Sequence, residues 1–267
     1  MNEPATYGKT LEGCRSVVYL FHALGTGSGY AEREARAAKQ FRDAATRYGI
    51  ETLVYLGGVA PLAPTSQHLE SRRATGRILG EGKLTVIELR AAMIIGRGST
   101  SFNLVRDLAV RTPLVALPDW LDHGSCPIAI DDVVYALVRA LELDMPQGGC
   151  FDLPGPEWLT HRELLSRVSS LVGTRIIKKP LPRISTKFAA RLLGLITRER
   201  PAIISELVEG LPSDLTPAGE SFWSAIGETP SRTIMSAILS ALADETSKVE
   251  PSVATRERLI ARVRERV

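Results

Sequence analysis

Cysteine is scarce in this chain, and what there is does not suit a disulfide framework or a zinc site. The 267 residues include three cysteines, Cys14, Cys126 and Cys150, and four histidines. The cysteines are odd in number and far apart, with no C-x-x-C pair, and the histidines are scattered without metal-ligand spacing. We therefore expect no metal site, and a reduced, cytoplasmic protein.

Long apolar runs and a large net charge are also missing. No run approaches the ~20 apolar residues that cross a bilayer, and residues 1–4 lack the charged and apolar regions of a signal peptide. The 33 basic and 30 acidic residues leave a net charge of +3, which is too small to indicate electrostatic binding of nucleic acid. The composition therefore predicts neither an integral membrane protein nor a nucleic-acid-binding protein.

The chain does contain a regular alternation of short apolar runs and amphipathic segments, with 44% hydrophobic residues overall. The predicted strands are residues 17–21, 52–56, 85–95, 127–130 and 151–153, with a further candidate at 175–181. The predicted helices are residues 31–48, 68–79, about 99–110, 133–143, 164–172, 185–195, 201–210 and 231–242. Strands that alternate with helices predict an α/β fold with a parallel sheet.

Domain organisation follows from where the strand signal fades. We predict a Rossmann-like α/β domain over residues 1–158 and a smaller, mainly helical lobe over residues 159–245. A polar tail over residues 246–267 ends in a basic amphipathic helix, which we expect to be solvated or loosely docked.

The glycine-rich turn at residues 25–29 follows a predicted strand and precedes a predicted helix, the position of a dinucleotide phosphate loop. The G-x-G-x-x-G fingerprint requires glycine or alanine where Tyr30 stands. The acidic ribose ligand expected ~20 residues later is also missing near residues 56–58. Two interpretations remain, a primary phosphate loop or the ligand-facing turn of a later strand, and the spacing favours the second.

A few polar residues stand out as candidate functional groups. His68 and Arg72 are four residues apart, so they share one helix face and could orient a hydroxyl group, but a helix start whose polar side faces water is the interpretation that the residues alone favour. Arg90 interrupts an apolar strand, and a buried arginine needs an acidic or phosphate partner. Asp131 and Asp132 are expected to cap the helix that follows them.

Five segments together resemble a known family. They are residues 17–25, 53–58, 88–96, 127–133 and 151–160. In this order they are similar to strands four, five and six, the I-x-V-x-D-V segment and the Y-N-I-G-G-P-E-x-L-T segment of the short-chain dehydrogenase/reductase superfamily. The resemblance is to its atypical, NmrA-like branch, which includes NAD(P)-binding epimerase-like proteins and the accessory nucleotide-binding subunit of respiratory complex I.

The resemblance implies a Rossmann-like sheet that binds NAD or NADP, and an oxidoreductase or epimerase acting on a small substrate. The residues that it places in contact with the cofactor are His22, Ala23, Leu24, Gly25, Gly57, Gly58, Arg90, Ala91 and Ile94. The family's catalytic Y-x-x-x-K pair falls on His68 and Arg72, and its serine falls on Gly57 or Gly58. Because these substitutions do not reproduce a tyrosinate beside a lysine, a non-catalytic nucleotide sensor or scaffold protein is the alternative.

The resemblance begins at the family's fourth strand, so the first three strands and the phosphate-binding loop have no counterpart. Residues 17–21 should then form the edge of the sheet, which favours association with another chain. Either the sequence is a fragment, the interpretation that we favour, or a partner chain or second copy covers this edge. Without the phosphate-binding helix N-terminus, dinucleotide affinity should be weak.

Overall fold

A computed structural model describes residues 4–59, 66–111, 116–143, 145–174, 179–180, 185–197 and 201–246. The strands are β1 (Ser16–Tyr19), β2 (Thr52–Gly58), β3 (Thr85–Ala91), β4 (Ile94–Ile95), β5 (Ala116–Leu117), β6 (Gly124–Ser125), β7 (Ile128–Ala129), β8 (Gly149–Asp152), β9 (Leu159–Thr160) and β10 (Lys179–Pro180). The helices are α1 (Pro4–Leu11), α2 (Tyr30–Arg47), α3 (Gln67–Gly80), α4 (Thr100–Arg111), the 3-10 helix η1 (Asp119–Asp122), α5 (Ile130–Glu142), α6 (His161–Leu171), α7 (Thr186–Ile196), α8 (Pro201–Gly210), α9 (Phe222–Ile226) and α10 (Ile234–Thr246).

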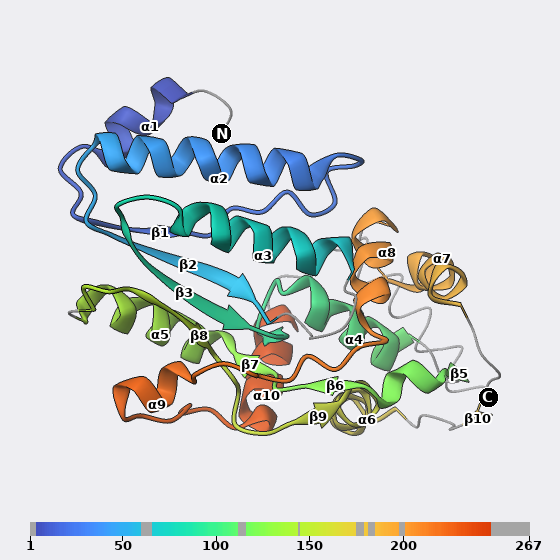
Figure 1. Cartoon of the computed structure of the whole chain (residues 1–267). Helices are drawn as coiled ribbons and strands as arrows, with labels where there is room; N and C mark the ends of the chain where they lie inside the picture. Colours follow the sequence, from blue (N-terminus) through green and yellow to red (C-terminus); the bar gives the residue numbers. More distant parts are fainter. Residues whose placement is uncertain are drawn as a thin grey trace.

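The central element is a four-stranded parallel sheet in the order β1-β2-β3-β8, with α2 and α3 on one face and α5 on the other (Figure 1). Successive residues of a strand point to opposite faces, and β2 is apolar on both. Leu53 and Tyr55 pack in the cluster that includes residues of α2 and α3, while Val54 packs in the cluster that includes residues of α5. All three side chains are fully buried. The predicted α/β fold with a parallel sheet is therefore confirmed.

The predicted third strand, residues 85–95, is wrong as a single element. Strand β3 ends at Ala91, and β4 begins at Ile94 and pairs with β7 in a separate two-stranded sheet. The backbone changes partners at this point, because Arg90 accepts a hydrogen bond from the Leu153 amide at 2.8 Å, whereas Met93 accepts one from the Ile128 amide at 2.9 Å. The apolar run is continuous since both sheets are buried, so periodicity alone does not reveal the break.

The helix predicted over residues 133–143 begins earlier than expected, and Asp131 and Asp132 do not cap it. The N-cap of α5 is Ala129, with no side-chain hydrogen bond, so both aspartates lie in the first turn. Negative charge is favourable there because of the helix dipole. The buried Asp132 carboxylate instead accepts hydrogen bonds from the Ser231 amide and hydroxyl and from the Arg232 amide, at 2.6–3.1 Å.

The remaining predictions beyond residue 159 have mixed outcomes. The predicted capping box is present, because the Thr160 hydroxyl accepts from the Glu163 amide and the Glu163 carboxylate accepts from the Thr160 amide. Helix α8 has the predicted bounds, α10 begins three residues later than predicted, and the short α9 was not predicted. Residues 175–178, residue 181 and the predicted tail helix lie outside the described residues.

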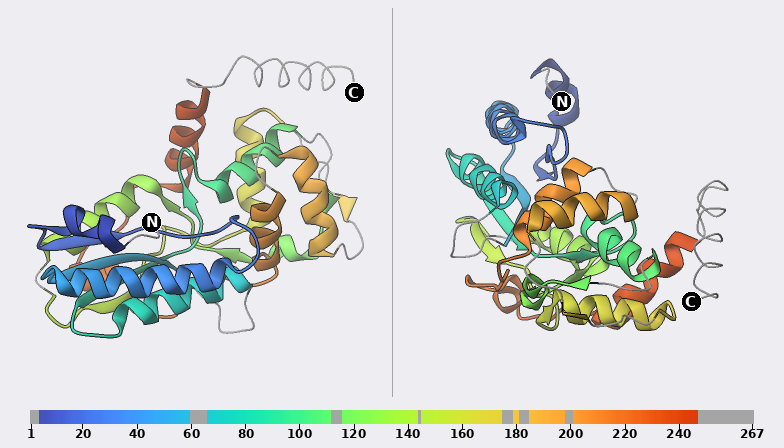
Figure 2. Two further views of the ribbon diagram at one scale, coloured as in Figure 1. Left: turned by 90° about the horizontal axis from the view of Figure 1, so that it is seen from above. Right: turned by 90° about the vertical axis from the view of Figure 1, so that its right-hand side faces the viewer.

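Helices α7 and α8 pack against one another and bring the lobe against α4 and α3 (Figure 2). Leu104 of α4 and Leu193 of α7 belong to one buried cluster with Ile204 and Val208 of α8. This cluster lies beyond the carboxyl ends of the sheet strands, so α7 and α8 lie over the ends of the strands (Figure 1), where α/β proteins bind ligands.

The sheet has an open edge at β1. Among the described strands, β1 pairs only with β2 and is an edge of the sheet, as predicted. Leu20, just after this strand, is 53% exposed. Within the described ranges, no helix is both long enough and apolar enough to span a bilayer.

Candidate functional site

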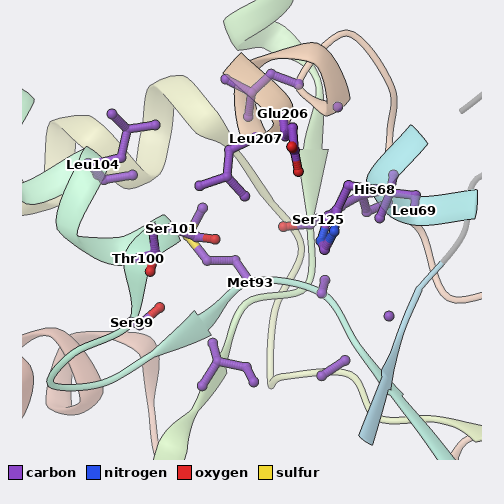
Figure 3. Close-up of a pocket in the computed structure, with 18 of the residues that line it drawn as sticks. His68, Leu69, Met93, Ser99, Thr100, Ser101, Leu104, Ser125, Glu206 and Leu207 are labelled. Carbon is purple, nitrogen blue, oxygen red and sulfur yellow. The ribbon is translucent and has the colours of Figure 1, made fainter. Parts of the chain in front are cut away.

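A cavity of about 630 Å³ lies at the carboxyl ends of β1, β2 and β3, between these strand ends and helices α3, α4, α7 and α8. Figure 3 shows side chains from α3 (His68, Leu69), α8 (Glu206, Leu207) and the β3–β4 segment (Met93) around it. Its volume falls in the range that holds a drug-sized ligand or part of a cofactor.

Most residues predicted from the resemblance line this cavity. They are His22, Leu24, Gly57, Gly58, His68, Arg72, Ala91 and Ile94. Three predicted residues do not line it. The Ala23 amide donates to the Glu34 carboxylate at 2.6 Å, Gly25 packs against Ile203, and the Arg90 guanidinium pairs with Glu88 at 3.0 Å, which is the acidic partner that a buried arginine requires.

Arg72 is already engaged by the protein. Its guanidinium donates to the Leu56 carbonyl and lies 5.2 Å from the centre of the Tyr55 ring, while the Tyr55 hydroxyl donates to the Arg72 carbonyl at 3.1 Å. One nitrogen, Nη1, is buried and has no hydrogen-bond partner among the described residues. Arg72 can therefore offer a single donor to a ligand without leaving its position.

Burial and Arg72 keep the neighbouring histidines uncharged. Burial is the largest cause that lowers the pKa of His68 to about 4, and Arg72 and His22 contribute in the same direction. The pKa of His22 is lowered by burial first and by Arg72 second. The buried Nδ1 atom of His68 has no partner in the part of the chain that the structure describes. At neutral pH the His68 ring is thus a neutral hydrogen-bonding group, and it is a weak proton acceptor.

A buried acid on α2, which the sequence patterns did not single out, fixes this side of the cavity. Glu34 is 1% exposed and accepts hydrogen bonds from the Ala23 amide and the Ser71 hydroxyl. It thereby ties the loop that carries His22 to the helix that carries His68. The one sequence signal for it is an acid in phase with the apolar stripe of α2, which also includes the buried Ala37 and Ala38.

The glycine turn at residues 25–29 does not form a phosphate cradle. The Arg33 guanidinium occupies the turn. It donates hydrogen bonds to the carbonyls of Thr26, Gly27 and Ser28 and to the Thr26 hydroxyl, at 2.8–3.1 Å. The turn thus directs its carbonyl oxygens at a cation, whereas a phosphate loop directs amide groups at an anion. This geometry favours the ligand-facing turn of a later strand over the primary phosphate loop.

Two more titratable side chains line the cavity and were also missed. Burial lowers the pKa of His161, the first residue of α6, to about 4. Burial raises the pKa of Glu206 on α8, and the carboxylates of Glu209 and Glu34 add to this effect. His161 Nε2 is buried without a hydrogen-bond partner among the described residues. The Tyr30 hydroxyl lies beside the Glu206 carboxyl and lowers its pKa, against the effect of burial. Neither residue has a sequence signal, because only the packing of the lobe brings them to the cavity.

The strand ends fit a nicotinamide ring and its ribose. Gly57 and Gly58 present no side chain to the cavity, and a Cβ atom added at Gly58 would come no closer than 3.9 Å to any neighbour. A flat ring can therefore approach the backbone here, and the unpartnered atoms of His68 and Arg72 can bond to polar groups on it. Within the described ranges, no three His, Cys, Asp or Glu side chains gather closely enough to hold a metal ion.

No family model and no curated protein sequence matches this chain. Solved structures do match its fold. A nucleoside-diphosphate-sugar epimerase from Staphylococcus aureus has a TM-score of 0.69 and 16% identity, over 88% of this chain and 80% of that one. The Bordetella bronchiseptica enzyme WbmG, in complex with NAD and UDP, has a TM-score of 0.66 and 14% identity, over 90% and 74% of the two chains.

A third neighbour is RMD from Pseudomonas aeruginosa, complexed with NADPH, with a TM-score of 0.66 and 14% identity over 92% of this chain and 86% of that one. At these identities the likeness shows the fold and leaves function open. The fold that the chain shares with them is a Rossmann-like parallel sheet covered by helices, as the sequence predicts.

Proposed function

We propose that this chain is an NAD(P)-binding protein of the atypical short-chain dehydrogenase/reductase type. In this proposal the ends of β1, β2 and β3 hold the nicotinamide half of the cofactor, and the adjoining cavity holds a small substrate. The observation that carries the proposal is the cavity at the carboxyl ends of the strands, lined by the predicted residues and containing the unpartnered His68 Nδ1 and Arg72 Nη1. The NAD- and NADPH-complexed neighbours support it through the shared fold.

In this proposal the residues of the site have specific roles. Bound NAD(P) would supply or accept a hydride at its nicotinamide ring. His68 would bond to a substrate hydroxyl through Nδ1, and Arg72 would hold a carboxamide or ribose oxygen through Nη1. The pKa of His68, about 4, makes it a poor general base at neutral pH. We therefore expect an oxidoreductase or epimerase with slow turnover.

The alternative is a nucleotide sensor or scaffold protein that binds without turnover. It is favoured by the engagement of Arg72 with Leu56 and Tyr55 and by the absence of a hydroxyl at Gly57 and Gly58. The uncovered edge of β1 is where a partner chain or second copy would pair. Assays with carbonyl and sugar-nucleotide substrates separate the two functions, because a sensor leaves the cofactor unconsumed.

Titration with NADH and NADPH, followed by nicotinamide fluorescence, tests the binding step. We expect saturable binding that is weaker than micromolar, and we expect Gly58→Val to weaken it at least tenfold by filling the space before the strand end. Gly80→Val is the matched control, because a Cβ atom there meets nothing within 4 Å. If neither nucleotide binds the folded protein at millimolar concentration, the proposed function is wrong; sub-micromolar binding would refute only the weak affinity.

A further inference from the structure

The half of the cavity that lies away from the strand ends has an aliphatic wall. Side chains from α4, α7, α8 and the residue after α8 form it: Leu104, Val105, Leu108, Leu193, Leu207 and Leu211. Several of these belong to, or pack against, the buried cluster that joins α4 to the lobe. The cavity thus continues from the polar strand ends into the apolar contact between two parts of the chain.

The side chains that line the aliphatic half of the cavity do not suit a nucleotide. Among the described lining residues of α7 and α8, Glu206 is the one charged residue, and its acidic side chain would repel a diphosphate. The cavity is also lined by Arg97 and by Ser99, Thr100 and Ser101, which lie before and at the start of α4, apart from the leucine-rich wall. Arg72, at the strand ends, is held by Leu56 and Tyr55. The leucine and valine side chains also offer no hydrogen bonds to a base, and a buried polar group without a partner is costly. The lining therefore selects against a sugar nucleotide in this half.

We infer that this half of the cavity binds an aliphatic chain, acyl or isoprenoid, whose polar end lies beside His68. The inference rests on the proposed function, because it names the substrate class of the same site. The polar end of such a ligand would meet His68 Nδ1, next to the strand ends where the nicotinamide is proposed to lie. The volume of about 630 Å³ is enough for a drug-sized molecule.

The test is calorimetric titration of the full chain with 1-alkanols from hexanol to dodecanol, with farnesol, and with UDP-glucose. We expect affinity to rise roughly three- to fourfold for each added methylene until the cavity is full, the fold-change that corresponds to burial of one methylene. The linear alcohols and farnesol separate the acyl and isoprenoid forms of the ligand. UDP-glucose should bind more weakly than dodecanol.

Two variants locate the binding site within the cavity. Leu207→Trp should fill the apolar half and weaken dodecanol binding at least tenfold, and Leu104→Ala should shift the optimal chain to a longer one. Leu239→Trp is the matched control, since Leu239 is half exposed on α10 and does not line the cavity. If Leu207→Trp does not fold, the chain-length series with the wild-type protein and Leu104→Ala decides.

Affinity that is independent of chain length, tighter binding of UDP-glucose than of dodecanol, or unchanged binding by folded Leu207→Trp would overturn the inference. The NADH titration is a separate readout, because Leu207 belongs to α8 whereas Gly57 and Gly58 end β2. If the wild-type protein binds NADH but no alkanol, the aliphatic ligand alone is refuted. Chain-length-dependent alkanol binding without NADH binding refutes the proposed function and leaves an aliphatic binding site.

Discussion

Replacing Glu34 with alanine removes the acceptor that ties the β1–α2 loop to α3. The carboxylate is 1% exposed and accepts from the Ala23 amide at 2.6 Å and from the Ser71 hydroxyl. Alanine leaves both donors buried without this acceptor, and each such group costs ~1–3 kcal/mol. We therefore expect Glu34→Ala to lower the free energy of unfolding by roughly 2–6 kcal/mol.

Glutamine separates the loss of charge from the loss of the acceptor. Glu34→Gln keeps one carbonyl oxygen for the Ala23 amide, and the Ser71 hydroxyl can rotate to accept from the new amide group. We expect a loss of about 1–2 kcal/mol, because hydrogen bonds to a charged group are stronger than neutral ones. Both variants should also weaken NADH binding, since the loop carries His22 and the helix carries His68.

The assay is urea unfolding followed by circular dichroism, with a double-mutant cycle between Glu34 and Ser71. A coupling energy of ~0.5–3 kcal/mol is expected for two residues in one hydrogen-bond network. Lys39→Ala is the control, because Lys39 is exposed on the same helix and should change stability by no more than about 0.5 kcal/mol. A loss below that value for Glu34→Ala, or no coupling to Ser71, would show that this network does not hold the site together.

Two further predictions concern the buried histidines and Asp132. The folded-state pKa values of His68 and His161, about 4, lie below the ordinary value, so the unfolded chain binds more protons between about pH 4 and 6.5. The stability that these histidines contribute is complete above about pH 6.5 and is lost as pH falls, by up to about 3 kcal/mol for each. His68→Gln and His161→Gln should each make the urea unfolding midpoint depend less steeply on pH between pH 7 and 4.5. Variants with the same pH dependence as the wild-type protein would contradict this prediction. Asp132→Ala should lower the free energy of unfolding by roughly 2–4 kcal/mol, because it leaves the Ser231 and Arg232 amides without this acceptor. Asp131→Ala, on the exposed side of the same turn, should lower it by less than about 1 kcal/mol. Equal losses for the two variants would refute the structural role of Asp132.

The sequence by itself determined the elements and their layering. Apolar runs with strand residues, such as 52–56, can be buried on both faces only inside a parallel sheet covered by helices, and the structure has this arrangement around β2. Capping chemistry is equally local, which is why the capping box of Thr160 and Glu163 could be read directly. Most strand-end residues of the cavity, including His22 and Gly58, were predicted from the family resemblance, and they lie together because the carboxyl ends of parallel strands meet at one edge.

Only the tertiary structure decided which polar side chains share the cavity and how they are charged. His161 and Glu206 come from helices that are far apart in sequence, and no local pattern distinguishes them from ordinary surface residues. Glu34 lies on a third helix behind the cavity, and its phase with the apolar stripe of α2 is the one local signal for it. The break after Ala91 and the turning of Asp132 toward Ser231 depend on partners that approach from later segments. Burial also fixes the low pKa of His68, because desolvation depends on the packing of α3, α8 and the sheet, and residue spacing does not encode it.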